Sequence, residues 1–382
     1  MKYLWLAFVS LLASYSVAQS QFVYTNNNVI TGTANSPNSV SAFLIAADGS
    51  LTQTSGSPFN TGGKGGGNNI DPEEIAIASR RNASFLYAAN NGSGTISAFA
   101  INPSTGHLAH VPGSPFLADG PPGGDYSLAV SPDDKFLFAT EDTATVIHIY
   151  LIGLHGVLIE VPGSPFPTGA NSQGLKVTAN GKFLIVGEGS INAVGVYSIS
   201  STGTLAAVPG SPFAASATPY DVDANCASDL VFVADSGSAA LIDAYSMAST
   251  GALTPVTGEP FSNGTTSTNG GLALSPNNQF LFVTDTFSQD ISSFSVAPDG
   301  ALAQIPGSPF ATANWTGGTS VTADGKFLYT AFFTTEQVDG RQIGANGALA
   351  AVLGTPFSNE QSQLGVPTVI TFPRPVCPVK QK

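Results

Sequence analysis

Residues 175–213 read LKVTANGKFLIVGEGSINAVGVYSISSTGTLAAVPGSPF, and this stretch shows the unit from which the chain is built. Short apolar runs alternate with turn signals, of which Asn180-Gly181 favours the positive φ of a two-residue hairpin turn. The closing segment 209–213 should stop the pairing, because proline has no N–H to donate to a strand ladder. The pattern predicts four strands, over residues 175–178, 183–186, 194–199 and 205–208.

Two signatures repeat this unit along the chain. A Gly-x-Pro-Phe motif recurs at spacings of 57, 50, 47, 48, 49 and 47 residues, and a strand that begins with Phe or Leu interleaves with it in fixed order. Four strands in a unit of this length are typical of a propeller blade. Because the motif lies where one blade crosses to the next, we interpret it as structural. Its seven copies begin at Gly56, Gly113, Gly163, Gly210, Gly258, Gly307 and Gly354.

The sequence therefore predicts an all-β, seven-bladed β-propeller with four-stranded antiparallel blades and almost no helix. The N-terminal unit lacks a first strand, because residues 22–25 already read as a second strand. Residues 366–372 form an unassigned strand near the C-terminus. We expect one C-terminal inner strand and three N-terminal strands to complete this blade, so that the closed ring leaves no open edge.

The first 18 residues predict a cleaved export signal. Lys2 gives a positive start, residues 4–12 are apolar but too short to span a membrane, and Ser16-Val17-Ala18 is a small-residue cleavage site. Residues 19–382 are then expected to form a single propeller domain. These features predict a secreted or periplasmic protein without a membrane span.

The composition limits the classes of partner. The chain has 25 acidic and 12 basic residues and a net charge of −13, which disfavours nucleic acids and anionic membrane surfaces. We expect a monomer with no cofactor and no metal, since no residue spacing typical of either occurs. Acidic residues do recur where second strands end, and we interpret them as turn caps rather than calcium ligands. They are Glu141, Glu188, Asp235 and Asp285.

The two cysteines, Cys226 and Cys377, leave two alternatives open: one disulfide in an exported chain, or two unrelated thiols. Cys226 is expected in a turn on the face opposite the start of the inner strands. Cys377 follows Phe372 by five residues, which reach roughly 16 Å when extended. A proline-rich tail could therefore cross the channel floor and join the two cysteines.

With seven blades and the phrase Ser-Pro-Asp-Asp-Lys-Phe-Leu-Phe at residues 131–138, the chain resembles the lactonase family of seven-bladed propellers. That family includes 6-phosphogluconolactonase-like proteins, and the chain is also similar to YVTN-type exported propellers. The resemblance covers residues 22–372 and implies the fold. Enzymes of the family carry His and Arg in the loops that lead into their inner strands. Here the matching stretches hold neither, so no catalytic residue is carried over; they are residues 71–74, 125–127, 172–174 and 218–221.

These loops converge on the mouth of the channel and carry a different set of side chains. Carboxylates beside aromatic rings suit a neutral sugar, a polyol or a cationic ligand. The same loops lack Lys and Arg, which should disfavour phosphorylated lactones. The candidate ligand-binding residues are Glu73, Glu74, Asp125, Tyr126, Gln173, Tyr220, Asp221 and Trp315.

Three interpretations of this mouth remain. The protein binds a small polar ligand or a cell-envelope partner there; or it is a lactone hydrolase of the 6-phosphogluconolactonase type with an unusual acidic site; or the acids are merely solvated. We expect the first, without the family's usual His and Arg catalytic set. The catalytic residues of the second are not identified by the sequence.

Overall fold

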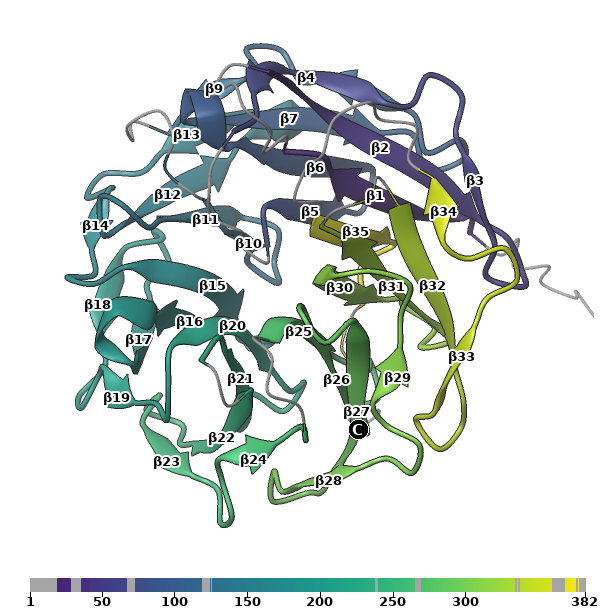
Figure 1. Ribbon diagram of the computed structural model, residues 1–382. Helices are drawn as coiled ribbons and strands as arrows, with labels where there is room; N and C mark the ends of the chain where they lie inside the picture. Colours follow the sequence, from purple (N-terminus) through teal and green to yellow (C-terminus); the bar gives the residue numbers. More distant parts are fainter. Residues whose placement is uncertain are drawn as a thin grey trace, which may run out of the picture.

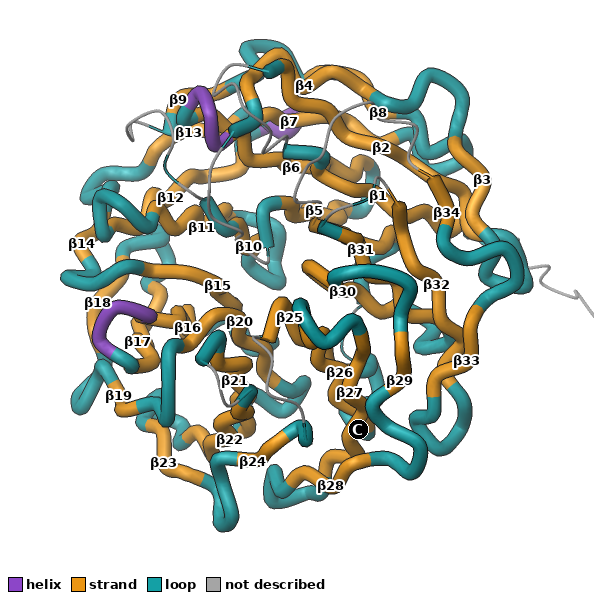
Figure 2. The backbone as a smooth tube through the Cα atoms, in the orientation of Figure 1, coloured by secondary structure: helices purple, strands orange, loops and turns teal. Residues whose placement is uncertain are grey.

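Seven five-stranded antiparallel sheets form a ring in the computed structural model (Figure 1). The structure describes residues 19–28, 36–66, 73–118, 124, 126–237, 240–264, 269–333, 335, 337–358, 368–375 and 377. The expected export signal and Asp125 lie outside these residues. Within the described chain, the helical segments are short 3-10 turns (Figure 2), and no helix is long and apolar enough to cross a bilayer. The turns are η1 (Asn91–Ser93), η2 (Leu154–Gly156) and η3 (Gly189–Ile191).

Each blade runs from an inner strand at the channel to short strands at the outside. The first blade contains β35 (Thr368–Phe372), β1 (Gln21–Asn26), β2 (Pro37–Ile45), β3 (Leu51–Gln53) and β4 (Phe59–Lys64); the second, β5 (Ile75–Arg80), β6 (Ala83–Asn90), β7 (Thr95–Ile101), β8 (Leu108–His110) and β9 (Phe116–Leu117); the third, β10 (Leu128–Val130), β11 (Phe136–Glu141), β12 (Val146–Ile152), β13 (Leu158–Glu160) and β14 (Phe166–Pro167).

The remaining blades repeat this order. The fourth contains β15 (Ser172–Val177), β16 (Phe183–Glu188), β17 (Ala193–Ile199), β18 (Leu205–Ala207) and β19 (Phe213–Ala214); the fifth, β20 (Pro219–Ala224), β21 (Leu230–Asp235), β22 (Leu241–Met247), β23 (Leu253–Pro255) and β24 (Phe261–Ser262); the sixth, β25 (Asn269–Leu274), β26 (Phe280–Asp285), β27 (Asp290–Val296), β28 (Leu302–Gln304) and β29 (Phe310–Ala311); the seventh, β30 (Thr316–Val321), β31 (Phe327–Phe332), β32 (Gln337–Ile343), β33 (Leu349–Ala351) and β34 (Phe357–Ser358).

The ring closes as the sequence predicts. β35 pairs antiparallel with β1, and Phe22 lies opposite Phe372 in the register. The first blade thus combines the C-terminal inner strand β35 with the N-terminal strands. The inner edge of β1, which would otherwise be unpaired, is hydrogen-bonded to β35.

The predicted four-stranded path of each blade is confirmed, and the Gly-x-Pro-Phe motif adds a short fifth strand that pairs with the third. The prediction that pairing stops at this motif is wrong, because the chain turns at Pro212 and Phe213 returns to pair opposite Val194 of β17. The preceding Ser211 accepts a hydrogen bond at Oγ from the Val196 N–H at 2.9 Å. Equivalent hydroxyls accept a third-strand N–H in five further blades, at Ser57, Ser114, Ser164, Ser308 and Thr355.

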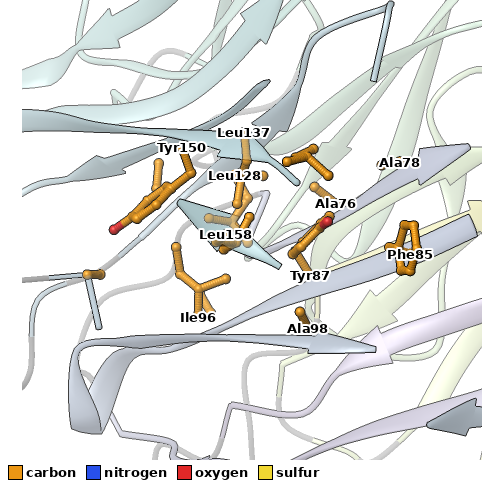
Figure 3. Close-up of a cluster of buried hydrophobic side chains, with 14 of the residues drawn as sticks. Ala76, Ala78, Phe85, Tyr87, Ile96, Ala98, Leu128, Leu137, Tyr150 and Leu158 are labelled. Carbon is orange, nitrogen blue, oxygen red and sulfur yellow. The ribbon is translucent and has the colours of Figure 1, made fainter. Parts of the chain in front are cut away.

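The hydrophobic core is divided among the interfaces between blades. Figure 3 shows the cluster between the second and third blades, where Tyr87 and Leu128 pack with Leu137. The Tyr87 hydroxyl donates to the Gly156 carbonyl oxygen of the next blade at 3.1 Å. Close packing requires glycine in these turns: Gly156 has a φ of +82°, and a Cβ there would lie 2.4 Å from the Phe85 ring. Each blade is therefore fitted against its neighbour, which fixes the inner strands around the channel.

Candidate functional site

The inner strands enclose a central cavity of about 470 Å³. Residues from β5, β10, β15, β20, β25, β30 and β35 line it, so every blade contributes to its wall. A cavity of this size suits a small ligand rather than a macromolecule. Its wall is mostly apolar, and the charged side chains on it are Glu73, Lys176, Asp221, Asp223 and Arg374.

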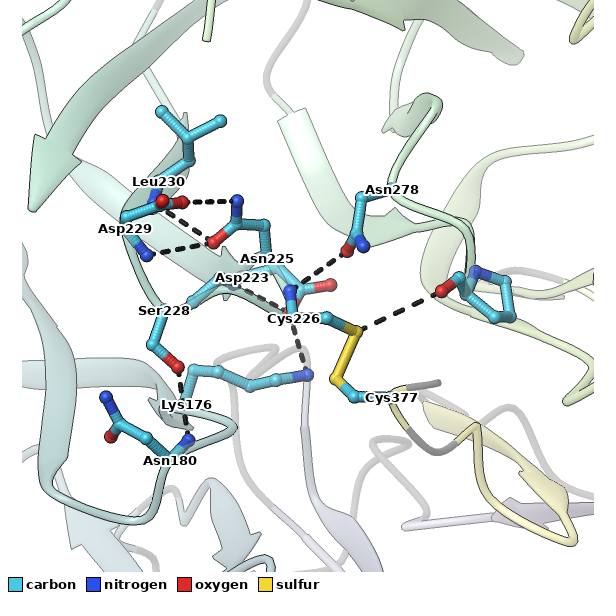
Figure 4. The surroundings of a disulfide bond; sticks show 12 residues. Lys176, Asn180, Asp223, Asn225, Cys226, Ser228, Asp229, Leu230, Asn278 and Cys377 are labelled. Atoms are coloured by element: carbon cyan, nitrogen blue, oxygen red, sulfur yellow. Dashed lines mark hydrogen bonds and ion pairs between the residues drawn. A yellow bond between two sulfur atoms is a disulfide. The ribbon is translucent and has the colours of Figure 1, made fainter. Parts of the chain in front are cut away.

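One end of this cavity is lined by residues that follow β35, which we call the strap (residues 373–375 and 377). Cys377 forms a disulfide with Cys226, which lies just beyond the end of β20, and the two residues also line the cavity (Figure 4). Arg374 is ion-paired with Asp134 at 2.8 Å. The expected link between Cys226 and Cys377 across the channel floor is therefore present. Since the strap lies at the face where the inner strands end, we expect a ligand to enter at the face where they begin.

Two of the candidate residues, Glu73 and Asp221, line the cavity together. Glu73 precedes β5, and its Oε2 accepts a hydrogen bond from the Leu175 N–H at 3.1 Å. Asp221 lies in β20 and accepts from the N–H groups of Leu272 and Val222, both at 2.8 Å. These carboxylates bond to the backbones of other inner strands. They consequently hold neighbouring blades together as well as presenting acidic groups to the cavity.

Two further charged residues of the inner strands also line the cavity. Lys176 of β15 and Asp223 of β20 form an ion pair at 2.8 Å, and 39% of the Lys176 side chain is exposed because it faces the cavity. Asp223 also accepts the Leu274 N–H at 2.9 Å. The expectation that no cation lies among these carboxylates is therefore wrong: Lys176 lies two residues beyond the stretch 172–174, which itself contains no Arg or Lys.

Burial and mutual repulsion change the protonation of this group. Burial raises the pKa of Asp221 to about 7, against the opposing hydrogen bonds from Leu272 and Val222. Burial, and then the nearby Asp221 charge, raise the pKa of Glu73 well above its usual range. Burial favours the neutral form of Lys176, but Asp223 and Glu73 outweigh it and raise the pKa of the ammonium group. The cavity thus combines the Lys176 cation with Asp221, a carboxyl that can exchange a proton near neutral pH.

Three other candidates are buried side chains and do not project into the mouth: Glu74, Tyr126 and Tyr220. Glu74 is fully buried, and its Oε1 accepts hydrogen bonds from the side-chain amides of Asn28 at 2.9 Å and Asn91 at 2.8 Å. Tyr126 is also fully buried, in the core between the second and third blades, and Tyr220 is 9% exposed. These side chains support the walls around the mouth.

The last two described candidates, Gln173 and Trp315, are more exposed than those three. Gln173 is half-buried, and its Oε1 lies against the turn at Gly189, where a Cβ would be 3.1 Å away. Trp315 is 38% exposed and lies directly before β30. Neither lines the central cavity. The role of all these candidates in ligand binding remains a prediction.

The acidic residues at second-strand ends have several structural roles. Glu141 caps its turn, because its carboxylate accepts from the Thr143 N–H at 3.2 Å and the Ala144 N–H at 2.5 Å. Glu188 accepts instead from the Tyr197 hydroxyl at 2.5 Å, and Asp285 accepts from Ser292 Oγ at 2.8 Å. Turn capping thus describes Glu141 but not these two blade-interior carboxyls. Among the described residues, no group of three His, Cys, Asp or Glu side chains is arranged to hold a metal ion.

Comparisons with known proteins agree with this architecture. The family model described as "Lactonase, 7-bladed beta-propeller" matches residues 36–164, about a third of the chain. The periplasmic gluconolactonase of Pseudomonas aeruginosa superposes with a TM-score of 0.65 at 16% identity, over 91% of this chain and 98% of that one. A candidate 6-phosphogluconolactonase of Bacteroides fragilis gives a TM-score of 0.68 at 15% identity, over 93% and 98%.

A second candidate 6-phosphogluconolactonase, from Bacteroides uniformis, has a TM-score of 0.69 and 14% identity, and the match covers 92% of this chain and all of that one. No curated protein matches the chain. At these identities the superpositions establish a common fold. The predicted resemblance to lactonase propellers is confirmed, while substrate and activity have to be argued from the cavity itself.

Proposed function

We propose that the protein is an exported propeller that binds a small polyhydroxylated ligand, a sugar or sugar lactone, in its central cavity. The observation that carries this proposal is the group Glu73, Lys176 and Asp221 on the wall of a cavity with the strap at one end. Carboxylates accept hydrogen bonds from sugar hydroxyls, and the Lys176 ammonium donates to a ring or carbonyl oxygen. Export is supported by the signal-like N-terminus and by the periplasmic neighbour of the same fold.

The charges on the wall favour a neutral sugar over a phosphorylated one. Lys176 is already paired with Asp223, and Glu73 and Asp221 add further carboxyls. A dianionic phosphate placed among them would meet repulsion that neither the paired Lys176 ammonium nor the Arg374 guanidinium, which is paired with Asp134, offsets. Neutral lactones such as D-glucono-1,5-lactone carry no such penalty.

Hydrolysis of the bound lactone is the second candidate function, and the pKa of Asp221 favours it. A carboxyl with a pKa of about 7 is suited to act as a general base at neutral pH. Each Asp221 oxygen accepts one backbone hydrogen bond, which leaves a further lone pair for a water molecule. Asp221 would take a proton as the water oxygen attacks the lactone carbonyl carbon, with Lys176 stabilising the oxyanion. The ring C–O bond then breaks, and the alkoxide receives the proton, giving the aldonic acid.

Two substitutions separate binding from catalysis. Lys176→Met removes the cation and Asp221→Asn removes the base, whereas Lys326→Met and Asp299→Asn make the same changes at exposed turn positions outside the cavity. Calorimetric titration with D-glucono-1,5-lactone and with a neutral sugar alcohol measures binding. Acid release above the uncatalysed rate, followed by pH-stat, measures hydrolysis.

The expected result is binding by the parent protein and both controls, with at least tenfold weaker binding by Lys176→Met. Loss of acid release in Asp221→Asn with binding retained supports hydrolysis; no acid release in the parent protein rejects hydrolysis and leaves the binding proposal. Unchanged affinity in Lys176→Met and Asp221→Asn, or a preference for 6-phosphogluconolactone, would overturn the proposed site.

A further inference from the structure

Two exposed aromatic rings meet on the surface between the sixth and seventh blades. Phe287 is 55% exposed and Trp315 38% exposed, and their ring centroids lie 5.1 Å apart with the planes at 89°. Phe287 follows β26 in the turn to β27, and Trp315 precedes β30. Single exposed apolar residues are ordinary on a protein surface, but a contacting pair of large rings is a typical feature of binding sites.

The strand registers place this pair at the end of the ring where we expect a ligand to enter. Asp285, the last residue of β26, lies opposite Asn269, the first residue of the inner strand β25. Thr316 likewise begins the inner strand β30 and lies directly after Trp315. The strap lies at the other end, where the inner strands finish. We therefore expect a ligand that reaches the central cavity to enter from the face that carries Phe287 and Trp315.

The backbone around Trp315 is fixed before any ligand arrives. The Trp315 N–H donates to Asn314 Oδ1 at 2.9 Å, and its carbonyl oxygen accepts from the Phe333 N–H at 2.9 Å. On the other side, the Thr312 N–H donates to the Gln289 carbonyl oxygen at 2.8 Å, which ties the segment before Trp315 to the turn that holds Phe287. A pre-positioned surface of this kind loses little conformational entropy on binding.

The chemistry of the surroundings indicates a sugar ring as the occupant. Aromatic faces carry a partial negative charge, and the C–H bonds of a pyranose, polarised by ring oxygens, carry a partial positive charge. In the sequence, the residues within three positions of a ring include Gln289, Thr312 and Asn314, which carry amide and hydroxyl groups of the kind that bonds to sugar hydroxyls.

We propose that Phe287 and Trp315 form an outer sugar subsite, so that the natural ligand is a glycoside of at least two rings that extends from the surface towards the cavity. This inference rests on the proposed binding of a sugar in the cavity and narrows the class of ligand. It assigns to Trp315 stacking at an outer subsite, not contact with the group that lies deepest in the channel.

The tryptophan content gives a direct readout. The chain has two tryptophans, and the other, Trp5, lies within the expected export signal, so the tryptophan emission of protein lacking residues 1–18, excited where tyrosine does not absorb, comes from Trp315 alone. Titration with glucose, cellobiose, maltose and their trisaccharides, with emission recorded, measures occupancy of the outer subsite. Phe287→Ala tests the ring contact, and Ile191→Ala is the control, because Ile191 is an exposed apolar residue, at 51%, in another second-to-third-strand turn.

We expect a saturable emission change with a disaccharide or trisaccharide and at least tenfold weaker binding in Phe287→Ala, with no effect of Ile191→Ala. D-glucono-1,5-lactone measured by calorimetry should bind equally well to Trp315→Ala, because it fits the cavity alone. Lactone binding without any oligosaccharide response overturns the outer subsite and leaves the proposed function standing. Failure of both ligands rejects both proposals. Saturable binding of tetramethylammonium in place of the sugars would overturn the assignment to carbohydrate.

Discussion

Removal of the Cys226–Cys377 disulfide should destabilise the propeller by an amount that follows from the position of the bond. The two cysteines are 151 residues apart in sequence, so the bond closes a loop that includes the fifth blade beyond β20, the sixth and seventh blades and the ring-closing strand. In the chain-entropy description, opening a loop of that length costs about 5 kcal/mol at 25 °C. With an unfolding entropy of about 0.75 kcal/mol/K for a chain of this size, the melting temperature should fall by about 7 °C.

Differential scanning calorimetry of oxidised protein, reduced protein and the Cys226→Ser/Cys377→Ser double variant provides the test. The reduced protein and the double variant should melt at the same lower temperature, and reductant should not shift the double variant further. Peptide mass spectrometry without reduction establishes that the oxidised sample contains the linked pair. If the linked and the reduced protein have the same melting temperature, the disulfide contributes nothing to stability and the reasoning from loop closure is refuted.

Three further predictions concern the fold. Removal of residues 366–382 takes away β35 and should abolish cooperative thermal unfolding; a truncated protein that melts like the intact chain would contradict ring closure by this strand. Burial raises the pKa of Asp235 to about 8 and that of Asp285 to about 9, so the folded state retains protons that the unfolded chain has released above about pH 4. Stability should therefore fall as the pH rises from about 5 to 9, and melting temperatures that rise over that interval would show the opposite sign. Gly106→Ala should cost about 1 to 3 kcal/mol in denaturant titration, because a Cβ there would lie 2.5 Å from the Phe22 ring. Gly169→Ala, which has a similar positive φ and open space around it, isolates the backbone strain; equal losses would rule out the steric clash.

The repeat made the ring predictable because each blade reuses the same local signals. The Asn180-Gly181 turn and the alternation of residues 194–199 specify a hairpin without reference to the rest of the chain. The fifth strand was not predicted because in most blades it is only two residues long, as at Phe213 and Ala214. Two residues are too few to show the alternation of apolar and polar side chains that identifies a strand. They pair only after the chain has turned at Pro212, and that return depends on the neighbouring third strand.

The site was predicted less completely, for a reason that lies in strand geometry. Successive side chains of a strand point to opposite sides, so neighbours such as Glu73 and Glu74 have different surroundings. Glu73 lines the cavity, whereas Glu74 is buried against Asn28 and Asn91. Lys176 escaped prediction because it lies near the end of β15 and not at the start of that strand, where the other candidates lie. Its signal in the sequence is a single cation between Leu175 and Val177, in a strand that is otherwise apolar at its centre.

The pairing of β1 with β35 also means that the ring cannot close until the end of the chain has been synthesised. Phe22 and its partner Phe372 are 350 residues apart. At ribosomal speeds of about 5 to 20 residues per second, roughly 20 to 70 seconds separate the appearance of the two strands. Throughout that interval the nascent chain presents an unpaired β1 edge, which is where a chaperone would bind or a neighbouring chain would add a strand. The same pairing that completes the ring thus makes its earliest strand the last to be protected.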